Sequence, residues 1–507
     1  MRHHLTELYV VAGALVAPVM SPATRVSSSR PIEPSAHEIV LASAEAIGGV
    51  DRLRSIRGVR VEEVGFEYLI STVTRRDAPP RMISQTIATL RSAADSSIRR
   101  TLVQVLPMRA GTLASTTIVN HGAAAVVRGK GLVPASVFDL ETSTEELLLS
   151  PERVLLTALD AKDLRLERDT TIGVVRHHVV SLGMGGARVR LFMDAASGFP
   201  TKLELVRAYP SSVFWAMWGD LTAITTWSAW AMEQGGVWYP RQRSVSLNGA
   251  AFRAYVVSSL DLAAAPTPDS LAIPDSVRAV FASVAARQRL LAERGTLPTL
   301  TPSPIASNAV LYQGGYQSAA VKQADGVVII EAPESPAKSK AVLADIATRW
   351  PGTRVKAVIT TSPMWMHIGG LREYAARRVP IYALDVNVPV VRSLLSAPYA
   401  QAPDSLAKVR VAPVIRSVGH LTTIGQGAER LELRPARGQH SSSMMLVYLP
   451  DQRLLYASDV VVPDAFEPVF AAGYWEELAR VVKRDGLTVE RLFAEHLPAT
   501  PWGDRAR

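Results

Sequence analysis

The chain has 507 residues, of which 48% are hydrophobic and 20% are charged. This length allows two large domains or three to four small ones, and the composition is that of a globular protein. The chain contains no cysteine, which excludes disulfide scaffolds, thiol nucleophiles and iron–sulfur clusters and leaves His, Asp and Glu as the main metal ligands. Because the net charge of +9 is not gathered in any long basic run, we predict no nucleic-acid partner.

The first 23 residues are typical of an export leader. Arg2, His3 and His4 precede a mostly apolar run, and the small residues Ser21 and Ala23 follow it. A charged start, an apolar centre and a site of small residues are the three parts of a secretory signal. A short N-terminal helix is the alternative interpretation. We predict a signal peptide over residues 1–23 and an exported protein, either periplasmic or secreted.

Residues 24–275 are predicted to form a β-rich domain built on an antiparallel sheet. After a helix over residues 37–47, the segment 59–119 alternates Thr, Val and Ile with Arg, Ser and Gln. This is the pattern of half-buried strands. Helix is expected again over residues 142–160, where Ser150-Pro151-Glu152 supplies a helix start. The sheet is expected to resume from about residue 177.

Residues 213–232 carry one charge, Asp220, and so resemble a membrane span. Gly219-Asp220 is a turn signal in the middle of the segment, so we predict a β-hairpin and no transmembrane span after the leader. The tryptophans of the segment fit either a protein core or an apolar cavity for a lipid-like ligand. They are Trp215, Trp218, Trp227 and Trp230.

Clusters of proline and threonine between residues 263 and 304 mark a joint in the chain. We predict a helical, proline-rich linker over residues 276–304 and a second domain over residues 305–507. From Ala309 onward, short strands alternate with helices, among them a helix over residues 335–349 and a strand over residues 355–360, which predicts an α/β fold. In such folds the active-site residues lie on loops at the carboxyl ends of strands. The loop between Thr360 and Gly370 therefore marks the candidate site.

Several short motifs follow one another along this second domain. They are Tyr316-Gln-Ser318, Gly326 to Pro333, Val358 to Gly370, Gln439-His440-Ser441, Leu454 to Asp459 and Glu495-His496-Leu497-Pro498. Their order and spacing over about 200 residues resemble those of the metallo-β-lactamase fold family. The resemblance implies a four-layer αββα sandwich, one or two metal ions, usually zinc, at one edge of the paired sheets, and hydrolase activity.

The metal-binding loop of this family reads His-x-His-x-Asp-His. The aligned positions here are Ser362, Met364, Met366 and His367, so three of the four ligands are absent. The candidate ligands that remain at their motif positions are His367, His440, Asp459 and His496. The resemblance then implies at most one zinc ion, which would lower the pKa of its bound water. His440 would serve as the fourth ligand or as a catalytic acid.

Three interpretations of these residues stay open. The first is an exported metallo-β-lactamase-fold hydrolase with a mononuclear zinc site, which attacks a small-molecule substrate with metal-activated water. The second is a non-catalytic binding protein of the cell envelope that keeps a metal-free relic of the hydrolase fold. In the third, Met364, Met366 and His367 bind copper(I). A shared zinc ion requires the four candidate side chains to converge within about 3 to 5 Å of one another.

Overall fold

The computed structural model describes residues 34–69, 80–93, 96–212, 214–294, 296–461 and 471–503. The predicted signal peptide, residues 1–23, lies outside these residues. Residues 36–507 cluster as one unit. Within the described ranges, no helix is both long enough and apolar enough to cross a membrane.

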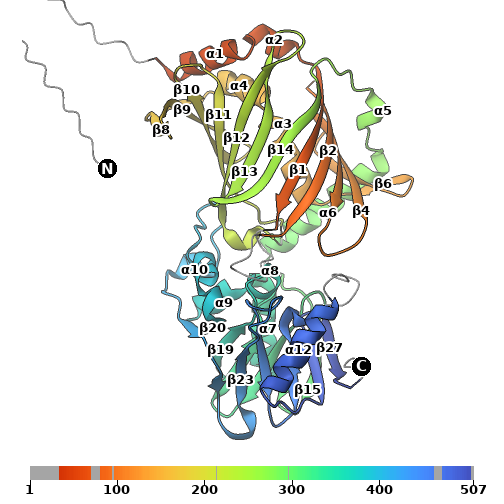
Figure 1. The fold of residues 1–507 in the computed structure, drawn as a ribbon, viewed down its shortest axis with the longest axis vertical. Helices are drawn as coiled ribbons and strands as arrows, with labels where there is room; N and C mark the ends of the chain where they lie inside the picture. The colour runs from red at the N-terminus through yellow and green to blue at the C-terminus, as the bar shows by residue number, and fades with distance from the viewer. Residues whose placement is uncertain are drawn as a thin grey trace, which may run out of the picture. The chain divides into compact units, whose positions relative to one another are not determined.

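The N-terminal half of the chain forms one antiparallel sheet of fourteen strands in the described ranges, which we call the large sheet (Figure 1). Its order is β6-β5-β4-β3-β2-β1-β14-β13-β12-β11-β10-β9-β7, and β8 pairs with β9. The strands are β1 Gly58–Tyr68, β2 Met82–Ser92, β3 Ser97–Val105, β4 Thr112–Asn120, β5 Ala123–Arg128, β6 Gly131–Pro134, β7 Arg165–Leu166, β8 Thr170–Ile172, β9 Val175–Met184, β10 Ala187–Asp194, β11 Pro200–Ala208, β12 Asp220–Met232, β13 Trp238–Leu247 and β14 Ala250–Asp261.

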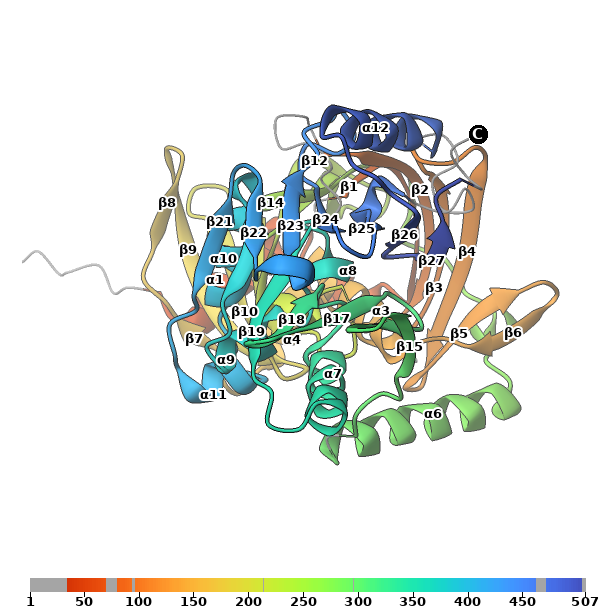
Figure 2. The same ribbon diagram turned by 90° about the horizontal axis from the view of Figure 1, so that it is seen from below.

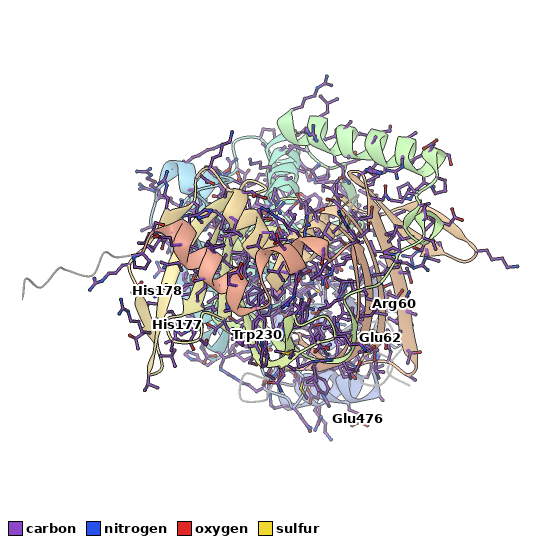
Figure 3. The ribbon with its side chains drawn as sticks, turned by 90° about the horizontal axis from the view of Figure 1, so that it is seen from above. Arg60, Glu62, His177, His178, Trp230 and Glu476 are labelled. Atoms are coloured by element: carbon purple, nitrogen blue, oxygen red, sulfur yellow. The ribbon has the colours of Figure 1, made fainter. Side chains whose placement is uncertain are left out.

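The alternating sequence of these strands gives the large sheet two different faces. In β1, Val59 and Val61 are buried, whereas Arg60 and Glu62 are exposed (Figure 3). Successive side chains of a strand point to opposite faces, so a period of two buries one face and leaves the other in solvent. The buried face also contains charged residues, beginning with Glu63.

Helices cover the buried face of the large sheet. Three of them share a core with β9 to β13: α1 Ala36–Ala46, α2 Val50–Ser55 and α4 Pro151–Asp160. Helix α3, Val137–Leu148, contacts β3, β4 and β5. The short α5, Pro268–Leu271, also contacts β3 and β4, and α6, Asp275–Glu293, packs on β5 and β6. Most of the predicted linker, residues 276–304, is therefore part of helix α6, which packs on the large sheet.

The predicted hairpin over residues 213–232 is wrong. A single turn of 3₁₀-helix, η1 Ala216–Trp218, leads into one continuous strand, β12, which pairs with β11 on one side and β13 on the other. Gly219 does turn the chain, with φ of 66°, but residues 214–218 before it form no strand. The pairing partners of β12 lie elsewhere in the chain, and a local turn signal does not identify them.

The C-terminal half contains two further sheets. The seven-stranded sheet has sequential order and consists of β15 Thr301–Ala306, β16 Ala309–Gln313, β17 Ser318–Gln323, β18 Gly326–Ile330, β19 Val355–Thr360, β20 Ile381–Leu384 and β21 Ile415–Val418. The six-stranded sheet consists of β22 Thr422–Ile424, β23 Leu431–Pro435, β24 Met445–Leu449, β25 Leu454–Tyr456, β26 Arg491–Ala494 and β27 Leu497–Pro501. Their facing apolar side chains form one shared core.

Helices pack on the outer face of each of these two sheets (Figure 2). On the seven-stranded sheet lie α7 Pro336–Arg349, α8 Trp365–Ile368, α9 Leu371–Ala376, α10 Val388–Ser396 and α11 Ser405–Val409. On the six-stranded sheet lies α12, Ala471–Arg484. The C-terminal half is thus a mixed α/β structure, as predicted.

Candidate functional site

The C-terminal half gathers a group of buried polar side chains at the ends of four strands. Glu331 follows β18, Thr361 follows β19, Asp459 follows β25 and Glu495 follows β26. Strands β18 and β19 are parallel to each other, as are β25 and β26. Because the carboxyl ends of parallel strands share one edge of a sheet, residues far apart in sequence meet here.

His367 of α8 is the centre of this group, and its side chain is 0% exposed. Its Nε2 donates a hydrogen bond of 2.7 Å to Oδ2 of Asp459. Its Nδ1 lies 3.2 Å from Oε1 of Glu331 and 4.0 Å from Oε2 of Glu495. Three carboxyl groups therefore surround one imidazole ring; we call these four side chains the His367 cluster.

The cluster keeps its histidine charged. Burial alone would lower the pKa of His367, but Asp459, Glu331 and Glu495 outweigh it and raise the pKa well above its usual range. Burial opposes the charge on Asp459 as well, yet His367 lowers the pKa of that carboxyl. Burial and the neighbouring carboxylates raise the pKa of Glu495. The cluster therefore contains an imidazolium paired with the Asp459 carboxylate.

Hydroxyl groups supply further hydrogen bonds to the cluster, although within the described residues three of its buried atoms, His367 Nδ1, Asp459 Oδ1 and Glu495 Oε1, make none. The backbone N–H of Thr361 donates to Glu331 Oε1 at 3.2 Å, and the Thr361 hydroxyl bonds Glu331 and Ser458. The hydroxyl of Tyr456 donates to Glu495 at 3.1 Å. Glu331 and Ser458 have φ of 69° and 52°. Such left-handed conformations are strained for these residue types and are found where surrounding contacts impose them.

His496 lies beside the cluster and His440 lies outside it. Nε2 of His496 is 3.9 Å from Oδ1 of Asp459, and its ring packs edge-on against Tyr316. His440 lies against α12, where its backbone N–H donates to Glu477 at 2.9 Å and its ring packs on Tyr474. The structure thus brings three of the four predicted ligands together, with His367 and His496 beside Asp459. It places the fourth, His440, against α12.

The three positions that replace the family ligands are apolar or internally bonded. Ser362 is fully buried, and its carbonyl oxygen accepts a hydrogen bond of 3.1 Å from Thr360. Met364 belongs to the core beneath α12, and Met366 packs against the cores on both outer faces. Thioethers that fill a core in this way do not support the copper(I) interpretation.

The residues of the His367 cluster do not fit a zinc ion. Two donors that share a tetrahedral ion with bonds near 2.0 to 2.1 Å stand about 3.3 Å apart, whereas Nε2 of His367 and Oδ2 of Asp459 stand at hydrogen-bonding distance, 2.7 Å. Within the described ranges, no three His, Asp or Glu side chains form a group that could hold a metal ion. We therefore derive no reaction step through a metal.

The sequence motifs contained two members of the cluster that were not predicted as site residues, Glu331 and Glu495. Both directly follow a strand, and a carboxylate at the end of a buried strand is the signal that could have found them. The other histidines of the described chain lie apart from the cluster. For example, His177 and His178 are on β9 of the large sheet (Figure 3), where His178 bonds Asp169 at 3.1 Å.

No protein-family model matches the chain, and no curated protein matches it. Among solved structures, a metallo-beta-lactamase from Pontibacter korlensis is similar at 16% sequence identity and a TM-score of 0.32, over 40% of this chain and 94% of that one. DIM-1 metallo-beta-lactamase is similar at 13% identity and a TM-score of 0.32, over 41% of this chain and 94% of its own.

Proposed function

We propose that this protein is a non-catalytic binding protein of the cell envelope. In this proposal, the leader exports the chain, and residues 305–507 form a metallo-β-lactamase-like αββα sandwich that serves as a scaffold without a metal centre. Its ligand is a small molecule or a lipid-like molecule. The alternative is the mononuclear hydrolase, which would require His367, His440, Asp459 and His496 to hold one zinc ion.

The direct hydrogen bond between His367 and Asp459 is the observation that carries this proposal. It engages two of the four predicted ligands with each other at 2.7 Å, which is too short for both to bind one tetrahedral ion. The contacts of His440 with Glu477 and Tyr474 point in the same direction. A buried polar group is stable without a metal ion when opposite charges within it compensate one another, as those of His367 and Asp459 do.

The metal content of the purified full-length protein tests the proposal. Cells are grown with added zinc, manganese, iron and copper, the protein is purified without a metal-affinity tag, and bound metal is measured by mass spectrometry of the elements. We expect less than about 0.1 ion per chain, since a fitted catalytic site would retain its metal through purification.

If the purified protein does contain metal, variants show whether the predicted ligands hold it. Stoichiometric zinc that is lost in Asp459→Ala and His496→Ala would overturn the proposal and establish the mononuclear site. His420→Ala is the matched control, because His420 is exposed and lies after β21, outside the cluster. Retention of zinc in that control would show that the loss in the other two variants is specific.

A further inference from the structure

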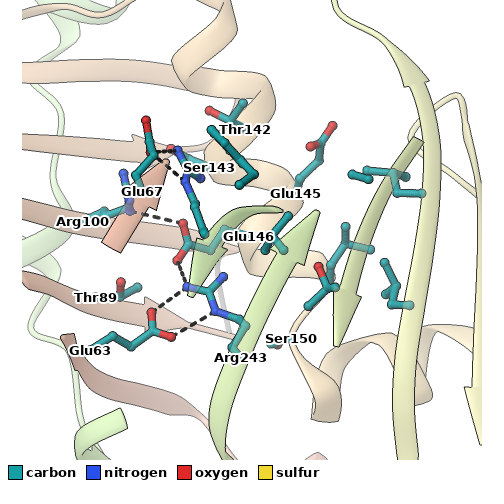
Figure 4. A pocket seen from close by; sticks show the side chains of 18 of the residues that line it. Glu63, Glu67, Thr89, Arg100, Thr142, Ser143, Glu145, Glu146, Ser150 and Arg243 are labelled. Carbon is teal, nitrogen blue, oxygen red and sulfur yellow. Dashed lines mark hydrogen bonds and ion pairs between the residues drawn. The ribbon is translucent and has the colours of Figure 1, made fainter. Parts of the chain in front are cut away.

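A cavity of about 540 Å³ lies on the buried face of the large sheet (Figure 4). Strands β1 to β3 and β11 to β14 supply most of its lining, and α3 contributes Phe138, Glu145 and Glu146. A volume of this size is within the range of small-molecule sites, roughly 300 to 1,000 Å³. The cavity is formed by residues of the N-terminal half and is separate from the His367 cluster.

One wall of the cavity is apolar. It is built by strands β11 to β14, and its residues include Leu203, Leu205, Leu221, Trp227, Leu247 and Phe252. Two of the four tryptophans singled out in the sequence, Trp215 and Trp227, line the cavity. Trp230 instead packs against Phe199 with a centroid distance of 5.2 Å. An apolar wall of this kind accepts an aliphatic chain through the hydrophobic effect.

The lining also carries four arginines, each paired with a glutamate, and we call these side chains the charged wall. Arg243 and Arg253 lie on β13 and β14, which also supply apolar lining, and Glu152 is the one glutamate of the four that does not line the cavity. The pairs are Arg91 with Glu152 at 3.4 Å, Arg100 with Glu146 at 3.3 Å, Arg243 with Glu63 at 2.6 Å and Arg253 with Glu67 at 2.8 Å. Arg243 also lies 3.8 Å from Glu146, which links two of the pairs (Figure 4). The remaining glutamate of this region, Glu145, pairs with Arg207.

Two of these groups, Glu146 and Arg243, have pKa values shifted toward the charged form although they lie inside the protein. Burial alone would raise the pKa of Glu146, but Arg100, Arg243 and Arg253 outweigh it and lower the pKa. Burial opposes the charge on Arg243, yet Glu63 and Glu146 raise its pKa. Part of each side chain remains accessible, 25% for Arg243 and 23% for Glu146. The charged wall therefore presents N–H donors and carboxylate acceptors that are already paired with one another. Two further carboxylates of the lining are bonded elsewhere, Asp139 to Ser136 and Glu145 to Arg207.

The pairing of these charges decides which ligand head group fits. Each of the four lining arginines already has a glutamate partner, so an anionic head group would have to displace a glutamate such as Glu63 from its arginine. A cationic head group would have to displace an arginine in the same way. A buried charge without a partner is costly. An uncharged head group can instead accept from guanidinium N–H groups through its ester and hydroxyl oxygens and donate to carboxylates through its hydroxyl groups.

We infer that this cavity binds a single-chain amphiphile whose oxygen-bearing head has no net charge, with the chain on the apolar wall and the head on the charged wall. This inference rests on the proposed binding function and names the class of its ligand. A monoacylglycerol has this chemistry. The volume of about 540 Å³ favours one chain over a two-chain lipid.

Titration calorimetry with three probes of equal chain length tests the inference on the full-length protein. The probes are monolauroylglycerol, laurate and dodecylamine, each below its micellar concentration. We expect one monoacylglycerol per chain and an affinity at least about tenfold higher than for either charged probe, a difference of 1.4 kcal/mol. Equal affinity for all three probes, or no binding of the monoacylglycerol, would overturn the inference.

Two variants locate the site. Ala223→Trp fills the cavity, because Ala223 is a lining residue of β12, and should weaken monoacylglycerol binding at least about tenfold. Ala88→Trp is the matched control, because Ala88 is exposed on β2 and should leave binding unchanged. Equal affinity of the two variants would refute this location for the site.

Glu146→Gln tests the role of charge without filling the cavity. It removes the carboxylate that pairs with Arg100. An anionic head group can then bind an arginine without displacing a glutamate, so the preference for monoacylglycerol over laurate should shrink at least about tenfold. An unchanged preference would contradict the charge argument. The metal content of the same samples separates the two proposals. Metal-free protein that binds no amphiphile refutes this inference alone, whereas stoichiometric zinc refutes the proposed scaffold role whether or not an amphiphile binds.

Discussion

Glu146 shows how one side chain can hold together a buried charged network. It projects from α3 toward Arg100 at 3.3 Å and Arg243 at 3.8 Å. Neither arginine can lose its proton at ordinary pH, so each needs a carboxylate nearby. Removing the charge of Glu146 takes away part of the negative charge that stabilises both arginines. The resulting loss of stability is larger than for an exposed pair, because water screens the remaining charges less.

We expect Glu146→Gln to lower the free energy of unfolding by about 2 kcal/mol at neutral pH, because buried polar groups lose a charged partner. The folded-state pKa of Glu146 is lowered from 4.5. Its contribution is therefore complete above about pH 4.5 and is lost as the pH falls through the folded value. Denaturation at pH 7 and at about pH 3.5 should show the difference between wild type and variant shrinking in acid.

An exposed pair provides the control for this prediction. Glu490 pairs with Arg453, and their side chains are 60% and 55% exposed. Glu490→Gln should change the free energy of unfolding by less than about 0.5 kcal/mol. If Glu146→Gln costs no more than this control, or if its cost stays constant as the pH falls, the network does not stabilise the fold through charge.

At the scale of single elements, the sequence predicted best those helix and strand bounds that neighbouring residues determine. The expected helix over residues 335–349 is α7, Pro336–Arg349, and the Ser335 hydroxyl accepts from the Lys338 N–H at 3.3 Å. The strand over residues 355–360 is β19. The segment 142–160 contains two helices, α3 and α4, divided at Ser150. Starts and ends of helices depend on a few neighbouring residues, whereas the pairing of β12 depends on strands distant in sequence.

Helix α3 begins with a capping box that we expect to matter for stability. The Ser136 hydroxyl accepts from the Asp139 N–H at 3.0 Å, and Asp139 in turn accepts from the Ser136 N–H at 2.9 Å. Ser136→Ala should therefore lower the free energy of unfolding by about 1 kcal/mol. Chemical denaturation of the full chain measures this loss.

Thr267→Ala is the comparison for the capping prediction. Thr267 occupies the same position at the start of α5, but its side chain makes no capping hydrogen bond. We expect a smaller loss than for Ser136→Ala, a few tenths of a kcal/mol. Equal losses in the two variants would show that the capping box of α3 adds nothing beyond the preference of each residue for its position.

At the scale of the whole molecule, the candidate site could be predicted only in part. The spacing of motifs identified His367, Asp459 and His496, which meet in the structure. It placed His440 with them, although the chain directs His440 toward α12. The charged wall of the cavity could not be predicted from the sequence. Arginine and glutamate that alternate with apolar residues are also the pattern of a strand whose charged face lies in solvent. Only the pairing of distant strands shows that this face is internal.

One contact between distant segments depends on a glycine. Gly219, just before β12, has φ of 66°, and a Cβ at this position would lie 1.9 Å from the carbonyl oxygen of Pro398. The next residue, Asp220, accepts a hydrogen bond of 2.7 Å from the Ala400 N–H. The Tyr399 hydroxyl donates to the Met217 carbonyl at 2.6 Å. Residues 216–220 and 398–400 thus join the large sheet to the segment between α10 and α11.

We expect Gly219→Ala to weaken this contact and to separate the unfolding of the two halves of the chain. Overlap with the Pro398 carbonyl forces the segments apart, at a cost of about 2 to 3 kcal/mol beyond the strain of the backbone. Gly235→Ala is the matched control, because φ is 88° but nothing lies within 4 Å of the added Cβ. Scanning calorimetry should resolve two transitions in Gly219→Ala and one in both the wild type and Gly235→Ala. A single transition in Gly219→Ala, at the temperature found for Gly235→Ala, would show that the two halves are coupled through other contacts.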